Sequence, residues 1–122
     1  MVQPNIMCNQ HLLGEHCELH MFVATLNKHK TVRGYVKNNC LEYKSIHKRH
    51  DDLVIEMRTR GMNHKSELPQ LDGWYFDHDR DVYFSGVNKE QSLKDLITRC
   101  DKCRIQGQFL LGDKIWQNIN VK

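Results

Sequence analysis

The sequence predicts an all-α fold, with one domain over residues 1–122, about three main helices, and an irregular or small hairpin insertion around residues 70–86. Apolar residues recur at helical spacing from about residue 9 to residue 28, and again from about residue 43 to residue 60. A third helix is indicated from about residue 88 by a capping asparagine and a short apolar face. A chain of 122 residues is long enough to bury a core as a single domain without a staple.

The first predicted helix, from about Asn9 to Lys28, combines an apolar face with a face of titratable groups. Its apolar residues recur at steps of three, four and seven: Leu12, Leu13, Leu19, Phe22, Val23 and Leu26. Two pairs flank this stripe at helical spacing, Glu15 with Glu18 and His16 with His20. An ordinary solvated face would contain such residues too. The density of histidine favours a functional role, because seven of the eight histidines lie in residues 1–66.

The second predicted helix follows a basic connection over residues 27–39 that contains Gly34 and room for a short helical turn. It runs from about Tyr43 to Arg60, and Gly61 is placed to act as its left-handed cap. Four residues form its apolar face: Ile46, Leu53, Val54 and Met57. Regular structure is expected to stop at Leu68-Pro69.

The second half of the chain gives weaker signals. Residues 70–86 alternate aromatic and acidic clusters, and their periodicity leaves a hairpin and an irregular loop both open. The third helix begins after Asn88 and continues to Cys100 or beyond, with Leu93, Leu96 and Ile97 on its apolar face. The tail from Ile105, which includes Gly112 and Trp116, has no strong pattern and is expected to pack across the helices.

Positive charge is concentrated in the first half of the chain. The formal net charge is +3, and residues 1–66 carry ten Lys and Arg against six Asp and Glu. Glu42 is the only acidic residue within residues 28–49, where seven Lys and Arg are interleaved with histidines. Such a stretch is typical of a phosphate-contacting surface, although charge runs are also common on ordinary solvated faces.

The cysteines and the absence of long apolar runs indicate a reducing cytosol, with no membrane association. The five cysteines are an odd number, there is no amino-terminal apolar region of a secretion signal, and no apolar run approaches the roughly 20 residues of a membrane span.

We expect no metal and no other cofactor. Cys100 and Cys103 form a single C-x-x-C, and the other cysteines are scattered singly, whereas zinc sites in small domains usually have a second ligand pair. A metal-dependent nuclease using His16 and His20, with His11, His50 or His64, is a minor alternative. In H-E-x-x-H helices the glutamate is next to the first histidine, whereas Glu18 is two residues from each.

Three stretches resemble the phage-type pyrimidine-dimer DNA glycosylase family, also called endonuclease V of the dimer-cleaving kind, of which this chain would be a divergent member. Gln10-His11-Leu12-Leu13, then Glu15 and Glu18-Leu19, is similar to that family's Q-H-L-x-x-E-x-x-E-L run. Lys28 to Arg33 is similar to its basic link, and Lys48-Arg49 through to Arg60-Gly61 to its second long helix.

The resemblance implies a DNA repair glycosylase with associated AP-lyase activity. Such an enzyme binds duplex DNA with damaged or abasic sites, flips the damaged nucleotide out and cuts the glycosidic bond with its own amino terminus. Here that amine would belong to Val2, or to Met1 if the methionine is retained, and Glu18 matches the catalytic carboxylate. An α-amine suits this role because its pKa lies near 8, about two units below that of lysine. A monomer is expected, and the resemblance implies the cytosol of a phage-infected or bacterial cell.

The same resemblance suggests which residues contact nucleic acid. The set comprises Gln10, His11, Lys30, Arg33, Lys48, Arg49 and Arg60, of which the arginines are candidates either for phosphate contact or for holding the carboxylates of the site. The family has arginines at the two positions that Cys17 and Met21 occupy here. Their loss favours an alternative in which the scaffold is a catalytically altered binding module, and the retained Glu18 opposes it.

Overall fold

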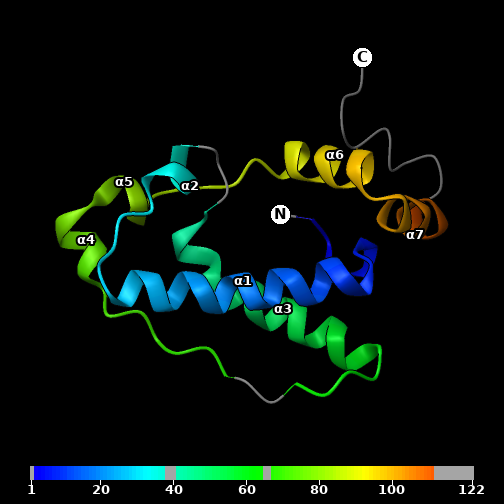
Figure 1. The fold of residues 1–122 in the computed structure, drawn as a ribbon, viewed down its shortest axis with the longest axis horizontal. Helices are drawn as coiled ribbons and strands as arrows, with labels where there is room; N and C mark the ends of the chain where they lie inside the picture. The colour runs from blue at the N-terminus through cyan, green and yellow to red at the C-terminus, as the bar shows by residue number, and fades with distance from the viewer. Residues whose placement is uncertain (1, 38–40, 65–66, 112–122) are drawn as a thin grey trace. The chain divides into compact units, whose positions relative to one another are not determined.

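The computed structural model describes residues 2–37, 41–64 and 67–111, and its regular elements are all helices (Figure 1). No strand occurs within these ranges, which confirms the all-α fold. The chain divides into two compact units. Unit 1 comprises residues 1–13 and 88–122, and unit 2 comprises residues 14–87.

Helix α1 spans Asn9–Asn27, as predicted. Five of its six predicted core residues are buried, namely Leu12, Leu19, Phe22, Val23 and Leu26. Leu13 is 42% exposed, so the prediction was wrong for that residue, since the buried stripe through Leu12 is narrower than the pattern suggested. The helix ends in a Schellman turn, in which the backbone N–H of Lys30 donates to the Thr25 carbonyl and that of His29 to the Leu26 carbonyl.

Unit 2 continues with the short α2 (Arg33–Lys37), the 3₁₀ turn η2 (Tyr43–Ser45) and the long α3 (Ile46–Thr59). Together, η2 and α3 confirm the predicted helix from about residue 43 to residue 60. The four predicted core residues of α3 are buried: Ile46, Leu53, Val54 and Met57. Gly61 has φ of +81° and caps the helix, as predicted. The N–H of Met62 donates to the Met57 carbonyl, and that of Gly61 to the Arg58 carbonyl, which is again a Schellman turn.

The segment around residues 70–86 forms two short helices, α4 (Trp74–His78) and α5 (Arg80–Tyr83), so the hairpin alternative was wrong. The physical reason lies in its acidic residues. The Asp72 side chain accepts a hydrogen bond from the Trp74 N–H at 3.0 Å, and that of Asp79 caps α5 through the Val82 N–H at 3.4 Å. Aspartates that bond to nearby N–H groups favour helical turns over strand pairing.

Unit 1 contains the 3₁₀ turn η1 (Pro4–Ile6), the start of α1, α6 (Lys89–Arg99) and α7 (Asp101–Leu111). Leu96 and Ile97 are buried, as predicted. The expectation of a patternless tail from Ile105 was wrong up to Leu111, because α7 buries Cys103 and Gly107 while Ile105 and Phe109 are exposed. Because this helix buries small residues and exposes large apolar ones, its sequence shows no apolar periodicity. Gly112 and Trp116 lie outside the described residues.

Asn88 caps α6, as predicted, and its side chain accepts a hydrogen bond from the Gln91 N–H at 3.0 Å. Replacing Asn88 with alanine is expected to lower the free energy of unfolding by about 1 kcal/mol, because that N–H loses its partner. Asn88→Ser retains a capping oxygen and should cost only a few tenths of a kcal/mol, or roughly a quarter of the alanine effect. Urea unfolding of the two variants checks this. Equal losses would contradict the capping role.

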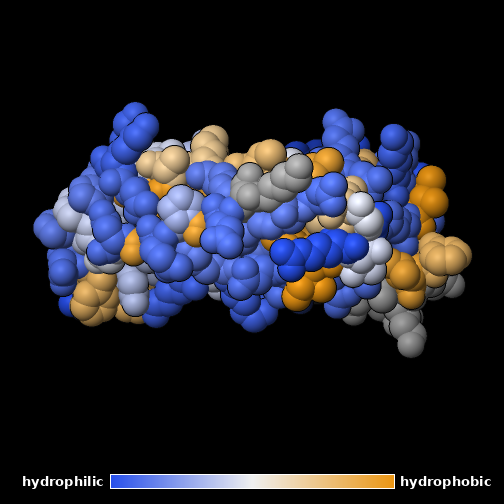
Figure 2. Space-filling model, turned by 90° about the horizontal axis from the view of Figure 1, so that it is seen from below, coloured by the Kyte–Doolittle hydropathy of each residue, from blue (hydrophilic) through white to orange (hydrophobic). Residues whose placement is uncertain are grey.

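None of the helices in the described ranges is long and apolar enough to cross a membrane. On the face drawn in Figure 2 most of the surface is hydrophilic, and hydrophobic residues appear there as separate patches.

Candidate functional site

In unit 2, Glu15 and Glu18 of α1 have different partners. Arg49 of α3, which is buried, donates from Nη2 to Oε1 of Glu15 at 3.0 Å and from Nε to Oε2. Glu18 is exposed, and among the described residues no group donates a hydrogen bond to its carboxylate. Arg49 therefore holds one carboxylate of the pair, and the other accepts no hydrogen bond from the part of the chain that the structure describes.

The pKa of Glu18 is raised above its ordinary value, chiefly by partial desolvation and then by the nearby Glu15 carboxylate. Both causes disfavour the ionised form. A raised pKa brings a carboxyl group closer to the pH at which it can both give and take a proton.

Four histidines converge in unit 2 beside this pair. His16 and His20 come from α1, His50 from α3, and His64 from the segment that follows the Gly61 turn. One ring nitrogen from each lies within 4.8 Å of the others. The Nε2 atoms of all four are buried and have no hydrogen-bond partner among the described residues.

The rings themselves lie close together, with centroids 4.8 to 5.2 Å apart in five of the pairs. Burial, and then the three neighbouring imidazoles, lower the pKa of His16 to about 4. The pKa of His50 is also lowered, mainly by burial. His16 therefore does not belong to a solvated rim on α1, as the sequence suggested. It lies inside the unit because α3 and the segment after it cover this side of α1.

In unit 1, the amino-terminal segment is held by α7. The Gln106 side chain donates hydrogen bonds to the backbone carbonyls of Asn5 and Met7, the latter at 3.1 Å. Val2 is buried. Met1, the alternative source of the terminal amine, lies outside the described residues.

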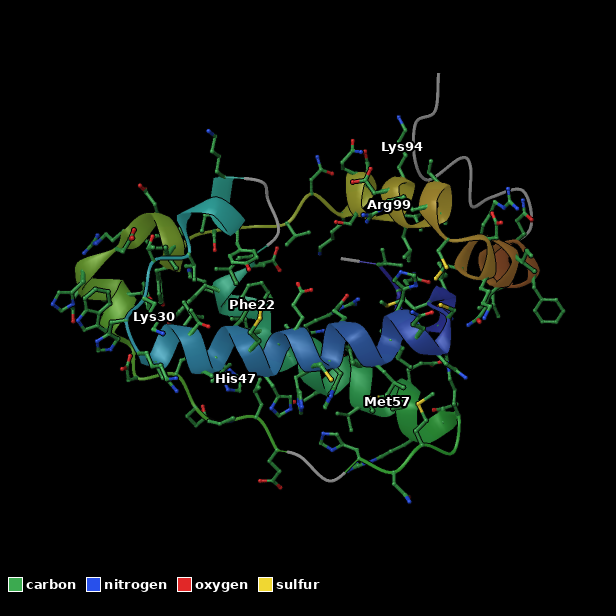
Figure 3. The ribbon with its side chains drawn as sticks, in the orientation of Figure 1. Phe22, Lys30, His47, Met57, Lys94 and Arg99 are labelled. Atoms are coloured by element: carbon green, nitrogen blue, oxygen red, sulfur yellow. The ribbon has the colours of Figure 1, made fainter. Side chains whose placement is uncertain are left out.

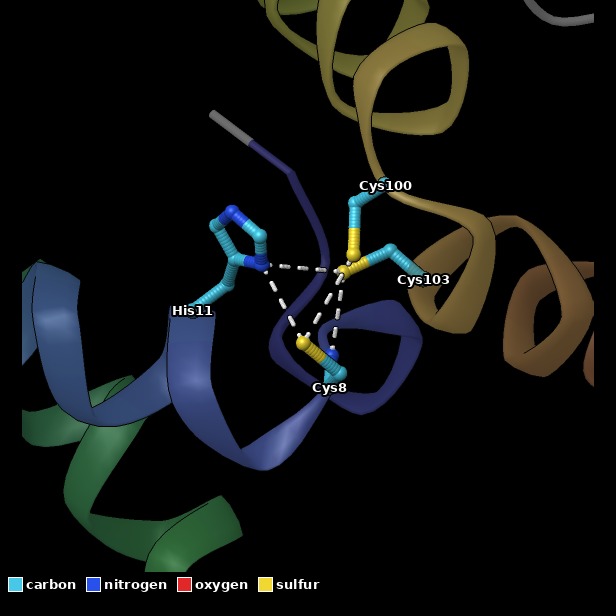
Figure 4. A group of neighbouring side chains, drawn as sticks. All are labelled: Cys8, His11, Cys100 and Cys103. Atoms are coloured by element: carbon cyan, nitrogen blue, oxygen red, sulfur yellow. Dashed lines mark hydrogen bonds between the residues drawn. The ribbon is translucent and has the colours of Figure 1, made fainter.

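A second donor set lies in the same unit, where three thiols and one imidazole face one another (Figure 4). The Cys8 Sγ is 3.1 Å from Nδ1 of His11 and 3.8 Å from Sγ of Cys100. The Cys103 Sγ is 3.6 Å from the same His11 nitrogen and accepts the Cys8 backbone N–H at 3.1 Å. Burial raises the pKa of Cys103 to about 12.

The residues predicted to contact nucleic acid have different surroundings. Gln10, Lys30 and Lys48 are exposed, with Lys30 in the connection after α1 (Figure 3). Arg49 forms an ion pair with Glu15, as in the carboxylate-holding option, whereas Arg60, at the C-cap of α3, pairs at 2.9 Å with Glu56 of that helix. His11 belongs to the thiol set, and the side chain of Arg33 lies outside the described residues. Contact between these residues and DNA stays a prediction.

Comparison with known proteins identifies the chain. A family model described as pyrimidine dimer DNA glycosylase matches residues 1–70. The chain belongs to the pyrimidine dimer DNA glycosylase family. The resemblance read from the sequence is thus confirmed. No curated protein and no solved structure matches significantly.

The range matched by the glycosylase family contains Glu18, the Arg49–Glu15 pair and all four clustered histidines. Cys100 and Cys103 lie beyond it. The thiol set was not predicted from the sequence because only cysteines were considered as a second pair of zinc ligands. Counting Cys8 and His11 as a C-x-x-H pair, three residues apart like the C-x-x-C pair, would have found it.

Proposed function

We propose that this member of the family is a DNA repair glycosylase with AP-lyase activity that acts on a flipped-out damaged nucleotide in duplex DNA. The observation that carries the proposal is the exposed carboxylate of Glu18 on α1, which lies inside the range that the family model matches. It accepts no hydrogen bond from the described residues and lies near the Glu15 carboxylate that Arg49 holds. We further propose that the protein acts as a monomer.

The reaction follows from the chemistry of an amine. The neutral α-amine of Val2, or of Met1 where it is retained, attacks C1′ of the deoxyribose as the base leaves with the bonding electron pair. The sugar ring then opens, as the electron pair of the C1′–O4′ bond and a proton go to O4′, and an imine between protein and sugar results. Abstraction of a C2′ proton then expels the 3′ phosphate by β-elimination. Glu18 stabilises the positive charge that develops at C1′ and carries the protons of these steps.

A panel of labelled duplexes tests this function. The panel contains a cyclobutane pyrimidine dimer, an abasic site, a set of oxidised and alkylated bases, and undamaged DNA. We expect incision of the dimer and of the abasic site and none of undamaged DNA. Binding to these duplexes without incision of any lesion would contradict the enzymatic proposal and would support the binding module instead.

The exposed lysines should contribute to affinity through phosphate neutralisation. Lys30→Ala and Lys48→Ala are each expected to weaken binding to any duplex sequence and to reduce the slope of log affinity against log salt concentration by about 1. Lys94→Ala is the matched control, because Lys94 is exposed on α6, outside the basic stretch (Figure 3). Fluorescence anisotropy at several salt concentrations measures the slopes. Equal slopes in all three variants would contradict contacts by Lys30 and Lys48.

A further inference from the structure

The four histidines of unit 2 are poorly explained as ordinary core residues. His16 is 8% and His50 is 5% exposed, and a buried polar atom without a partner costs about 1 to 3 kcal/mol. All four Nε2 atoms are without a partner among the described residues, and one ring nitrogen from each histidine lies within 4.8 Å of the others. A neutral imidazole offers a lone pair at its unprotonated nitrogen, and a shared cation satisfies all four at once.

We propose that His16, His20, His50 and His64 bind one zinc ion through their Nε2 atoms. His16 and His20 lie one helical turn apart on α1 and so face the same point. The Schellman turn at Gly61 reverses the chain after α3, and His64 follows it three residues later. The tetrahedron of a zinc ion with Zn–N bonds of about 2.1 Å has edges of about 3.4 Å. Small rotations of the rings close the present spacing, which is at most 4.8 Å.

The surroundings support this assignment. Nδ1 of His50 lies 3.6 Å from Oδ1 of Asp51, and a carboxylate beside the second ring nitrogen is a common way to orient a metal-bound histidine. Four protein ligands complete a tetrahedral shell and leave no position for a reactive water, which is the pattern of a structural zinc site. The ion therefore fastens α1 to α3 and to the segment after Gly61. Its two ligands on α1, His16 and His20, flank Glu18 in the sequence. The ion does not supply a hydrolytic nucleophile.

A second, independent observation concerns unit 1, where the geometry points to another zinc ion held by Cys8, His11, Cys100 and Cys103. With Zn–S bonds of about 2.3 Å, tetrahedral edges are about 3.8 Å between sulfurs and about 3.6 Å between sulfur and nitrogen. The distances are 3.8 Å from Cys8 Sγ to Cys100 Sγ, and 3.1 and 3.6 Å from His11 Nδ1 to the Cys8 and Cys103 sulfurs.

A backbone group supports this second set. The N–H of Cys8 donates to the Cys103 sulfur at 3.1 Å, as is expected around a metal-bound thiolate. Cys100 lies between α6 and α7, and Cys8 immediately precedes α1. Zinc here fixes the amino-terminal segment against α6 and α7 within unit 1. If the terminal amine is the nucleophile, the ion helps to position it.

Metal analysis of the purified full-length protein tests both sites without DNA, so its outcome is independent of the proposed enzymatic activity. We expect two zinc ions per chain by elemental mass spectrometry, one in His64→Ala and one in Cys100→Ser. His78→Ala and Cys17→Ser are the matched controls, because both residues are exposed and lie outside the two sets, and each should keep two ions. Removing zinc from the unmodified protein should lower its thermal midpoint by roughly 10 °C or more.

Each site has its own contradicting result. One ion that persists in His64→Ala and is lost in Cys100→Ser would overturn the histidine site, and the reverse would overturn the thiol site. A purified protein without any zinc would overturn both sites. A disulfide between Cys8 and Cys100 in the fresh protein would overturn the thiol site.

Cobalt(II) titration of the metal-depleted, unmodified protein answers the same question without any variant that could misfold. Two binding steps are expected, both giving the visible absorption of tetrahedral cobalt and only one giving thiolate-to-cobalt charge transfer. A single step with charge transfer contradicts the histidine site, and steps without charge transfer contradict the thiol site.

Discussion

Replacing Glu18 with glutamine is expected to slow base excision by about 10² to 10⁴-fold in single-turnover reactions. Glutamine has nearly the same size and remains neutral, so it neither stabilises the positive charge at C1′ nor carries the protons of imine formation and elimination. The side chain is exposed and accepts no hydrogen bond within the described residues, so the change should leave the fold intact. Affinity for undamaged duplex should change little.

The matched control is Glu90→Gln, which alters an exposed glutamate in the first turn of α6 and should leave excision unchanged. Circular dichroism and zinc content should be measured on both variants. Excision at the unmodified rate by a folded, zinc-loaded Glu18→Gln protein would remove Glu18 from the mechanism.

Replacing Arg49 with alanine is expected to lower the free energy of unfolding by about 3 kcal/mol, near the low end of the range for breaking a buried ion pair. The Arg49 side chain is 5% exposed and that of Glu15 is 27% exposed, so the loss leaves a partly buried carboxylate without its guanidinium. Urea unfolding followed by circular dichroism measures the loss.

The adjacent residue provides the comparison. Lys48 pairs with Asp52 on the same helix at 3.1 Å, but its side chain is 81% exposed. Lys48→Ala should therefore cost less than about 1 kcal/mol, because water and salt screen an exposed pair. Similar losses in the two variants would show that burial does not strengthen the Arg49–Glu15 pair.

The fold could be predicted wherever a helix buries an apolar stripe and ends in a recognisable cap. Helix α3 is the clearest case, since its four core residues and Gly61 are all visible in the sequence. Helix α7 could not be found in this way, because the residues that it buries include Cys103 and Gly107. The two short helices after Gly73 were missed because aspartate side chains bond to local N–H groups, which apolar periodicity does not report.

The candidate site was accessible in part. The family-like run indicated Glu18 as the proposed catalytic carboxylate, and Arg49 pairs with Glu15, which is one of the roles considered for the arginines. The sequence suggested the histidine set only as a minor alternative, with His11, His50 and His64 as options, since tertiary packing decides which of them join His16 and His20. Helical spacing alone relates His16 to His20, and it made His16 look like a surface residue.

The proposed mechanism depends on an imine between the free amino terminus and C1′ of the damaged nucleotide. Borohydride traps such an imine when the protein is incubated with abasic or dimer-containing duplex, and peptide mapping locates the adduct. A stable protein–DNA adduct is expected on the α-amine of Val2 or Met1, and it should disappear when that amine is blocked by acetylation. Incision of the DNA with no trapped adduct, or an adduct on a lysine side chain that survives acetylation of the terminus, would contradict it.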